Sequence, residues 1–307
     1  MARPAIVLDC DPGLDDAVAI LVAAKHTELL GITTVCGNSS VDNTTRNALH
    51  VLELAGIDVP VHRGAATPLV APLQDARHIH GPGGLGPVEP TVQRDAAGDD
   101  AAGWLIDVTN ERSDVHLVAV GPLTNVALAM RRDPGFAGRL AGLTIMGGGA
   151  TKGNVTAAAE FNIWADPEAA AIVFGSGIHV RVVPLDLTLQ VLMTDAHVAA
   201  LRDAATPTSS FVAGLLEFYR QRQREQGKES TGAVHDPCAV LAVTHPELFD
   251  LHDVRIDIEL AGTFTRGMTV VDRRARDPER PRNAAVALSA DADRVLSLIV
   301  DAAITPS

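Results

Sequence analysis

The sequence predicts an α/β fold in which a mainly parallel central sheet is covered by helices, with extra antiparallel strands near the C-terminus. Two observations support this prediction. Short β-branched runs alternate with longer helical patterns between residues 5 and 188. The runs are continuously apolar, which is typical of strands buried on both faces of a parallel sheet. The chain has 307 residues and no internal repeat or low-complexity tract, so we expect a single domain over residues 1–307.

The first part of the chain supplies the parallel strands and the helices between them. The apolar runs predicted to be strands lie at residues 5–8, 29–36, 115–120, 143–148 and 179–188. The amphipathic segments predicted to be helices lie at 14–26, 41–56 and 122–134. This alternation of strands and helices favours a parallel sheet.

The last third of the chain follows a different pattern. Two helices are predicted there, at 206–226 and 235–248. Antiparallel strands are then predicted to close the chain, at 253–262, 267–272 and 283–289.

Composition limits the class of function. The formal charge of −13 makes the surface repel nucleic acid and anionic membranes. No apolar stretch approaches the length of a membrane span, and the N-terminus lacks the pattern of a secretory signal. The three widely spaced cysteines, Cys10, Cys36 and Cys238, do not suggest a disulfide framework. We therefore expect a cytoplasmic protein with no nucleic-acid or membrane partner.

The stretch LDCDPGLDD places four carboxylates around a Pro-Gly turn after the first strand: Asp9, Asp11, Asp15 and Asp16. Asp15 and Asp16 can be explained as residues that cap the following helix, where negative charge is favoured. Capping does not explain Asp9 and Asp11. A hard cation such as calcium does, because it takes carboxylates, backbone carbonyls and waters together.

Polar residues also follow the other predicted strands. The carboxyl ends of parallel strands form the ligand-binding edge of an open sheet, so we expect these residues to lie near the aspartates. They are Asn38, Thr124, Asn125, the segment 146–154, the EFN run at 160–162, and Asp186. His235 and Asp236 open a late helix, where an Asp before a proline is also explained as an ordinary N-cap.

Together, the ordered motifs resemble the nucleoside hydrolase family of the inosine-uridine-preferring type. The motifs that carry the resemblance are DCDPGLDDAVAI, TTVCGN, HIHG, GPLTN, MGGG, GN followed by EFN, and VHDPCAV. The resemblance implies one domain of Rossmann-like topology, a bound calcium ion (Ca²⁺), and hydrolysis of the N-glycosidic bond of ribonucleosides to free base and ribose. It also implies a homo-oligomer, either a dimer or a tetramer.

The resemblance further implies roles for individual residues. The metal ligands would be Asp11, Asp16, the main-chain carbonyl of Thr124, and Asp236. Asp11 would also be the general base that takes a proton from a calcium-bound water, and His235 would protonate or hydrogen-bond the departing base. The substrate-binding residues, with His80 on the base side and the others around the ribose, would be Asp15, Asn38, His80, Met146, Asn154, Glu160 and Asn162. Carboxylates and amide oxygens suit this reaction, because departure of the base leaves positive charge on the ribose.

One segment, residues 219–228, departs from the family's pattern. Tyr219 is its only aromatic residue, where the family often places base-contacting aromatic side chains on a mobile helix. The polar candidates for base contacts are Arg222, Gln223, Arg224, Gln226 and Lys228. The preferred base therefore stays open.

Two other functions share features with this sequence. A haloacid-dehalogenase-like phosphatase also carries an Asp-x-Asp pair after its first strand, but the later Lys and acidic pair of that class have no counterpart here. A catalytically inactive nucleoside-binding protein would keep the pocket, but Asp11 is present together with all its proposed metal partners.

Overall fold

The computed structural model describes residues 3–225, 227, 232–274 and 280–306. Its strands are β1 (Ala5–Cys10), β2 (Glu28–Thr34), β3 (Val61–Arg63), β4 (His116–Ala119), β5 (Gly142–Met146), β6 (Val180–Val183), β7 (Phe249–Ile258), β8 (Thr269–Asp272) and β9 (Ala284–Ala290). The described residues form one nine-stranded sheet with the order β3-β2-β1-β4-β5-β6-β9-β7-β8.

The predicted α/β class is confirmed. All neighbouring strands from β3 to β9 pair in parallel, and β7 pairs antiparallel with both β9 and β8. Strand β9 therefore joins the parallel part of the sheet to the antiparallel part.

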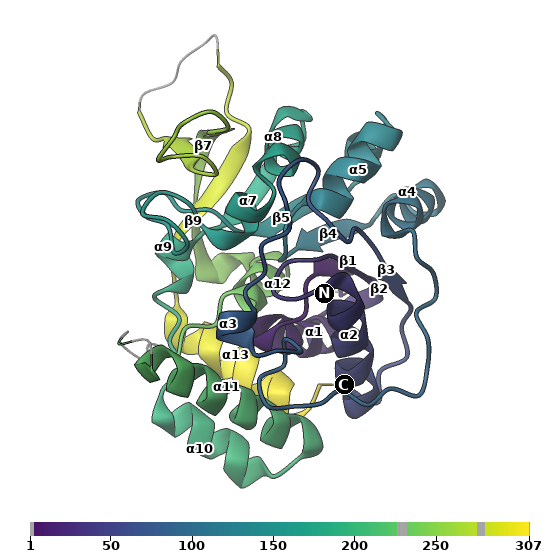
Figure 1. Ribbon diagram of the computed structural model, residues 1–307, viewed down its shortest axis with the longest axis vertical. Coiled ribbons are helices and arrows are strands. Elements are labelled where there is room, and N and C mark those ends of the chain that lie inside the picture. The colour runs from purple at the N-terminus through teal and green to yellow at the C-terminus, as the bar shows by residue number, and fades with distance from the viewer. Residues whose placement is uncertain (1–2, 226, 228–231, 275–279, 307) are drawn as a thin grey trace.

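The helices cover both faces of the sheet (Figure 1). They are α1 (Leu14–His26), α2 (Val41–Ala55), α3 (Arg77–His80), α4 (Ala101–Glu111), α5 (Thr124–Arg132), α6 (Phe136–Arg139), α7 (Phe161–Ala165), α8 (Pro167–Gly175), α9 (Leu185–Thr188), α10 (Asp195–Ala204), α11 (Pro207–Glu225), α12 (Asp236–Thr244) and α13 (Ala292–Ile304), with a 3₁₀ turn η1 (Pro246–Leu248). No helix among the described residues is both long and apolar enough to cross a membrane.

The alternation of side chains along the strands divides the core into two layers. Ile6 and Leu8 of β1 pack with α1, α2, α11, α12 and α13, whereas Val7 packs on the opposite face with α4, α5 and α8. Figure 1 shows these two groups of helices on opposite sides of the sheet. Because both faces are covered, the ends of the strands are the place where polar side chains can gather.

The order of the strands creates a switch point beside β1. The chain runs from β1 outward to β2 and β3, and it then returns to add β4 on the other side of β1. Connections that leave two neighbouring strands in opposite directions open a crevice at the carboxyl ends of those strands. Asp11 follows β1 and Thr124 follows β4, so both lie at this crevice.

Two predictions about individual elements need correction. The strand predicted at 179–188 ends at Val183, and residues Leu185–Thr188 form the short helix α9 instead. The carbonyl of Pro184 accepts hydrogen bonds from the N–H groups of Leu187 and Thr188, which starts the helical turn. The chain also does not close on antiparallel strands, because α13 follows β9 and packs on α1.

Candidate active site

The turn between β1 and α1 is closed by Asp16. Its Oδ1 accepts a hydrogen bond from the backbone N–H of Asp11 (3.0 Å), and its Oδ2 accepts one from the N–H of Gly13 (2.9 Å). N–H groups at the start of a helix have no partner within the helix, so Asp16 caps the turn. Capping therefore explains part, but not all, of the role of this buried carboxylate.

Asn38 joins the loop after β2 to the same turn. Its backbone N–H donates to Oδ2 of Asp11 (2.6 Å), while its side-chain amide donates to the carbonyl of Asp11 (3.1 Å) and to Oδ2 of Asp16 (3.0 Å). The donor side of the amide is thus already engaged. Only the amide oxygen remains to meet a ligand in the cavity that Asn38 lines.

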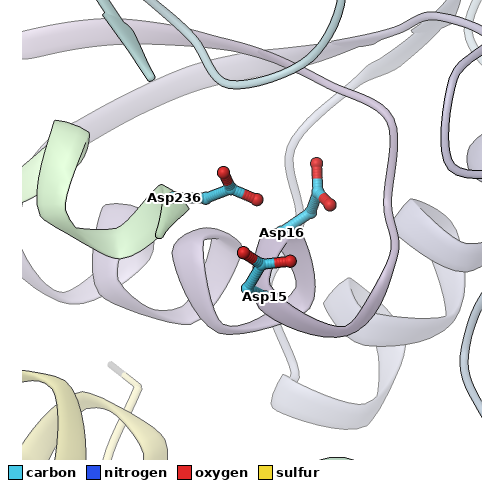
Figure 2. Close-up of side chains that lie close together, drawn as sticks. All are labelled: Asp15, Asp16 and Asp236. Carbon is cyan, nitrogen blue, oxygen red and sulfur yellow. The ribbon is translucent and has the colours of Figure 1, made fainter. Parts of the chain in front are cut away.

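Three carboxylates converge at this point from two helices. Asp15 and Asp16 come from the first turn of α1, and Asp236 is the first residue of α12. Each offers an oxygen that lies within 4.8 Å of an oxygen from each of the others. Figure 2 shows the three side chains gathered around a common space.

The cluster is electrostatically unfavourable by itself. Burial raises the pKa of Asp16 to about 7, with a further contribution from the charge of Asp15. Burial and then the neighbouring carboxylates raise the pKa of Asp236, and burial and the charge of Asp16 raise that of Asp11. Among the described residues, Oδ1 of Asp11 is buried without a hydrogen-bond partner.

The residues present fit a hard cation. Buried carboxylates that lack a compensating charge are costly, and a divalent ion among them would remove that cost. An all-oxygen donor set is suited to calcium or magnesium, whereas zinc usually takes nitrogen or sulfur ligands. The cluster could therefore hold a metal ion.

Asp9 does not belong to this cluster. Its Oδ1 accepts hydrogen bonds from the hydroxyl of Thr33 (2.5 Å) and the side-chain amide of Asn125 (2.8 Å), beneath the turn. Burial raises the pKa of Asp9 to about 6. These hydrogen bonds link β1 to β2 and α5, while Oδ2 of Asp9 is buried without a partner among the described residues.

Thr124 is fixed by a residue that the sequence reading missed. Its hydroxyl donates to Oδ2 of Asp166 (2.7 Å), and the same carboxylate accepts N–H groups from Leu69 and Ala169. The ADPEA sequence around Asp166 carries the Asp-Pro signature of a helix N-cap, and that signature could have identified it.

The predicted ribose-binding residues line one side of a cavity of about 1110 Å³. Asn162 donates its amide N–H groups to the carbonyls of Val120 (2.7 Å) and Met146 (3.1 Å), which leaves its amide oxygen available. Oε2 of Glu160 accepts the N–H of Gly148 (2.8 Å), and burial raises the pKa of Glu160 to about 7. Asn154 accepts the N–H of Phe161 (3.0 Å) and also lines the cavity.

Two histidines line the same cavity. Nδ1 of His80 accepts the backbone N–H of Leu14 (3.1 Å), and burial lowers the pKa of His80 to about 4. Nδ1 of His235 lies 2.7 Å from the hydroxyl of Thr188, and burial lowers its pKa while the charge of Asp15 opposes that shift. The structure thus brings His80 and His235 into one cavity with the residues predicted to bind ribose.

The candidates in residues 219–228 separate into three groups. Tyr219 and Gln223 line the cavity, and a hydrogen bond joins their side chains. Arg222 instead pairs with Glu225, and Arg224 is exposed. Gln226 and Lys228 lie outside the described residues.

Sequence reasoning also missed the apolar wall of the cavity. Trp164 and Phe161 of α7, Leu215 and Leu216 of α11, and Leu189 after α9 all line it. Apolar residues at helical spacing are ordinarily assigned to the core, so the sequence offered no signal that separates these from buried packing residues.

The chain is similar to nucleoside hydrolases over nearly its whole length. The family model described as inosine-uridine preferring nucleoside hydrolase matches residues 6–297. An inosine-uridine preferring nucleoside hydrolase of Leishmania major is 43% identical over 304 residues, which cover 97% of this chain and 96% of that protein. The non-specific ribonucleoside hydrolase RihC of Salmonella agona is 43% identical over 293 residues, 94% of each chain.

Solved structures are similar in fold. A purine-preferring ribonucleoside hydrolase from Gardnerella vaginalis has a TM-score of 0.92 and 32% identity, and the match covers 98% of both chains. A plant nucleoside hydrolase has a TM-score of 0.92 and 34% identity, with coverage of 98% of this chain and 99% of that chain.

Proposed function

This chain belongs to the inosine-uridine preferring nucleoside hydrolase family, and from that premise we propose how its carboxylates take part in the hydrolysis of the N-glycosidic bond of ribonucleosides. The observation that supports the proposal is the carboxylate cluster at the β1/β4 crevice, in which Asp15 and Asp236 line the cavity and Asp16 is buried beside them. Family membership also speaks against a haloacid-dehalogenase-like phosphatase, since nearly the whole chain matches hydrolases of nucleosides.

The proposed ion is calcium. Asp11, Asp16, Asp236 and the main-chain carbonyl of Thr124 are the proposed ligands. Asp11 is included because its Oδ1 is buried without a partner among the described residues, although its oxygens are outside the group of three within 4.8 Å. When bound, calcium supplies positive charge that orders water and a sugar diol and makes the water more acidic.

Asp11 is the proposed general base. Its Oδ2 is held by the N–H of Asn38, which fixes the orientation of the carboxylate. The attacking water gives that proton to Asp11 as its oxygen forms a bond to C1′ of the ribose. The bond from C1′ to the base nitrogen breaks, and its electron pair leaves with the base.

The sugar is held by groups that suit a positively charged ribose. The amide oxygens of Asn38 and Asn162 and the carboxylates of Asp15 and Glu160 are the proposed contacts, with Asn154 and the main chain of Met146 nearby. Preorganised oxygens stabilise positive charge in the transition state without having to reorganise, because their own partners already hold them.

On the base side, His235 is the proposed proton or hydrogen-bond donor to the departing base. His80 is a proposed second contact: since its Nδ1 accepts an N–H, a neutral His80 carries its proton on Nε2. Tyr219 and Gln223 extend this side of the cavity.

Release of reducing sugar from inosine, adenosine, guanosine, uridine and cytidine tests the proposal. We expect free ribose from at least one of the five ribonucleosides. Tight binding with no ribose formed from any of them would instead indicate an inactive nucleoside-binding protein.

We also propose a homo-oligomer, a dimer or a tetramer, of one-domain subunits (residues 1–307) in the cytoplasm. The three cysteines are all free and buried, which is consistent with a reducing compartment. Light scattering coupled to gel filtration would measure the oligomeric state, and a monomer at micromolar concentration would contradict this part of the proposal.

A further inference from the structure

The ring of His235 has a single hydrogen-bond partner among the described residues, and that partner is Thr188. Nδ1 lies 2.7 Å from Oγ1 of Thr188, although the two residues are 47 positions apart in the chain. Thr188 is fully buried, whereas His235 lines the cavity. The bond therefore connects a ring in the cavity wall to a hydroxyl behind it.

Thr188 has a rigid support. It ends the short helix α9, where its N–H bonds to the carbonyl of Pro184 (3.1 Å). The helix itself is tied to the loop after β5, because Leu185 donates to the carbonyl of Gly148 (3.0 Å) and Asp186 accepts the N–H of Ala150 (2.6 Å). A β-branched side chain on such a support has few rotamers, so the hydroxyl is fixed in place.

From this geometry, and resting on the role proposed above for His235, we propose that Thr188 is a positioning residue that aims Nε2 of His235 at the departing base. An imidazole ring can rotate about two side-chain bonds. The bond at Nδ1 removes that freedom and leaves Nε2 as the nitrogen that faces the substrate. A ring that carries hydrogens on both nitrogens can then pass the Nε2 proton to the base as the bond to C1′ breaks, which leaves a neutral ring with its hydrogen on Nδ1. A neutral ring with its hydrogen on Nε2 can donate a hydrogen bond to the base from the same position.

The hydroxyl partner suits a ring that gives up a proton. A threonine hydroxyl can either donate or accept a hydrogen bond, so it can hold Nδ1 whether or not that nitrogen carries a hydrogen. His80 offers a contrast within the same cavity. Its Nδ1 meets the backbone N–H of Leu14, which can only donate, so this contact is compatible with one neutral tautomer alone.

The chain offers a matched control. Thr144 of β5 is also fully buried, and its hydroxyl lies 2.9 Å from Nε2 of His116. Neither residue lines the cavity. Thr144→Val therefore removes the same kind of hydroxyl–imidazole bond without touching the site.

The test compares two substrates in purified, calcium-loaded protein. The base of inosine leaves poorly as an anion and needs the proton, whereas p-nitrophenyl riboside releases a stable phenolate. We expect Thr188→Val to lower kcat on inosine by about 10- to 100-fold with little change on the nitrophenyl substrate, since a misplaced catalytic group loses about that much. Thr188→Ser should recover most of the inosine rate, and Thr144→Val should leave the ratio of the two rates unchanged.

Two further measurements make the outcome decisive. The double variant His235→Ala with Thr188→Val should be no slower on inosine than His235→Ala alone, because Thr188 acts through the ring. The ¹⁵N signals of the His235 ring should change in Thr188→Val and be restored in Thr188→Ser. Where Thr188→Val does not fold, Thr188→Ala takes its place in the same comparison.

The proposal is overturned if Thr188→Val keeps the wild-type ratio, if Thr188→Ser is as slow as Thr188→Val, or if the double variant shows an additive loss. A different result would remove the proposed role of His235 itself: equal losses of His235→Ala on both substrates, with calcium content intact. The two failures are therefore distinguishable.

Discussion

At the scale of single residues, most polar groups of the site have one side committed to the protein and one side left for a ligand. Asn38 and Asn162 both use their amide N–H groups on the protein and keep the amide oxygen. Asp11 keeps one oxygen, Oδ1, without a partner among the described residues. The site therefore presents acceptors, which suits a substrate that brings hydroxyl donors and develops positive charge.

Substitution of Asp11 tests its role most directly. Asp11→Asn keeps the size of the side chain and an oxygen for the N–H of Asn38, but removes the proton acceptor. We expect kcat to fall by about 100- to 10,000-fold on every ribonucleoside, since this is the usual contribution of a general base. Steady-state rates with calcium content measured in parallel would show it, with exposed Asp293→Asn as the control. A loss of less than about tenfold with calcium bound would exclude Asp11 as the base.

The sugar hydroxyls should decide which substrates are accepted. If Asn162, Glu160 and the ion contact both hydroxyls, removal of the 2′-hydroxyl leaves buried polar groups without a partner. Each such group costs about 1–3 kcal/mol, so kcat/KM for deoxyuridine should be at least about 10- to 100-fold below that for uridine. Comparable turnover of the two nucleosides would contradict the assignment of these residues to the ribose.

At the scale of elements, long periodic segments were predictable and short ones were not. Strand β1 and helices α1 and α2 follow from apolar runs and caps that lie close together in the sequence. Strand β3 has three residues and helix α9 has four, too few to show a period. Such elements are set by their partners in the fold, as the pairing of β3 with β2 illustrates.

The same limit applies to the candidate site. Motifs at the strand ends identified residues such as Asp11, Glu160 and His235, because the ligand-binding residues of an open parallel sheet lie at the carboxyl ends of its strands. Asp166 and Thr188 act on Thr124 and His235 through contacts across 42 and 47 positions. The sequence shows the residues but not which of them meet, so these supporting contacts could come only from the structure.

The start of α1 is the element most sensitive to a small change. A Cβ at Gly13 would clash with Nδ1 of His80 and would lie 2.8 Å from Nδ2 of Asn38, so both side chains would have to move. We expect Gly13→Ala to lower kcat/KM by about 10- to 100-fold. It should also lower the free energy of unfolding by about 1–3 kcal/mol, as overpacking usually does.

A glycine on another helix provides the control for this variant. A Cβ at Gly214 of α11 would meet nothing within 4 Å. Gly214→Ala should therefore leave the kinetics unchanged and raise the free energy of unfolding by about 0.5–1 kcal/mol, because alanine is the better residue inside a helix. Chemical denaturation and steady-state kinetics of both variants would decide the matter. Wild-type kinetics in Gly13→Ala would show that the close approach of His80 and Asn38 does not matter for activity.

At the scale of the whole molecule, the site concentrates negative charge in a protein that is already negative. The formal charge of −13 includes the carboxylates that the crevice at β1 and β4 gathers from helices packed on one face of the sheet. Helices α1 and α12 pack against each other, and each carries part of the cluster. Repulsion between the carboxylates therefore pushes these two helices apart. The stability of the fold should therefore depend on the ion and on pH together.

The direction of the pH dependence follows from the buried carboxyl groups. The folded protein raises the pKa of Asp16 to about 7, of Glu160 to about 7 and of Asp9 to about 6, each mainly by burial. Unfolded carboxyl groups titrate near about 4, so between pH 4 and 7 these three groups bind more protons in the folded state of the metal-free protein than in the unfolded state. They make stability fall as pH rises through this window, whereas buried histidines such as His80 and His116, whose pKa burial lowers to about 4, oppose that fall below about pH 6.5. Groups with a lowered pKa, such as Asp100 and Asp75, lose their contribution only at lower pH.

We therefore expect the chelated protein to melt several degrees lower at pH 8 than at pH 5.5. Added calcium should raise the melting temperature at pH 8 and have much less effect at pH 5.5, because an ion binds ionised carboxylates and stabilises only the folded state. Calorimetry of the chelated and reloaded protein at the two pH values measures both effects, and activity should disappear and return with the ion.

Asp236→Asn is the matched variant: it removes one charge from the cluster, so it should flatten the pH dependence of the metal-free protein and weaken the response to calcium. A metal-free protein, verified by elemental analysis, that is as stable at pH 8 as at pH 5.5 would mean that the cluster does not carry the repulsion inferred from its burial.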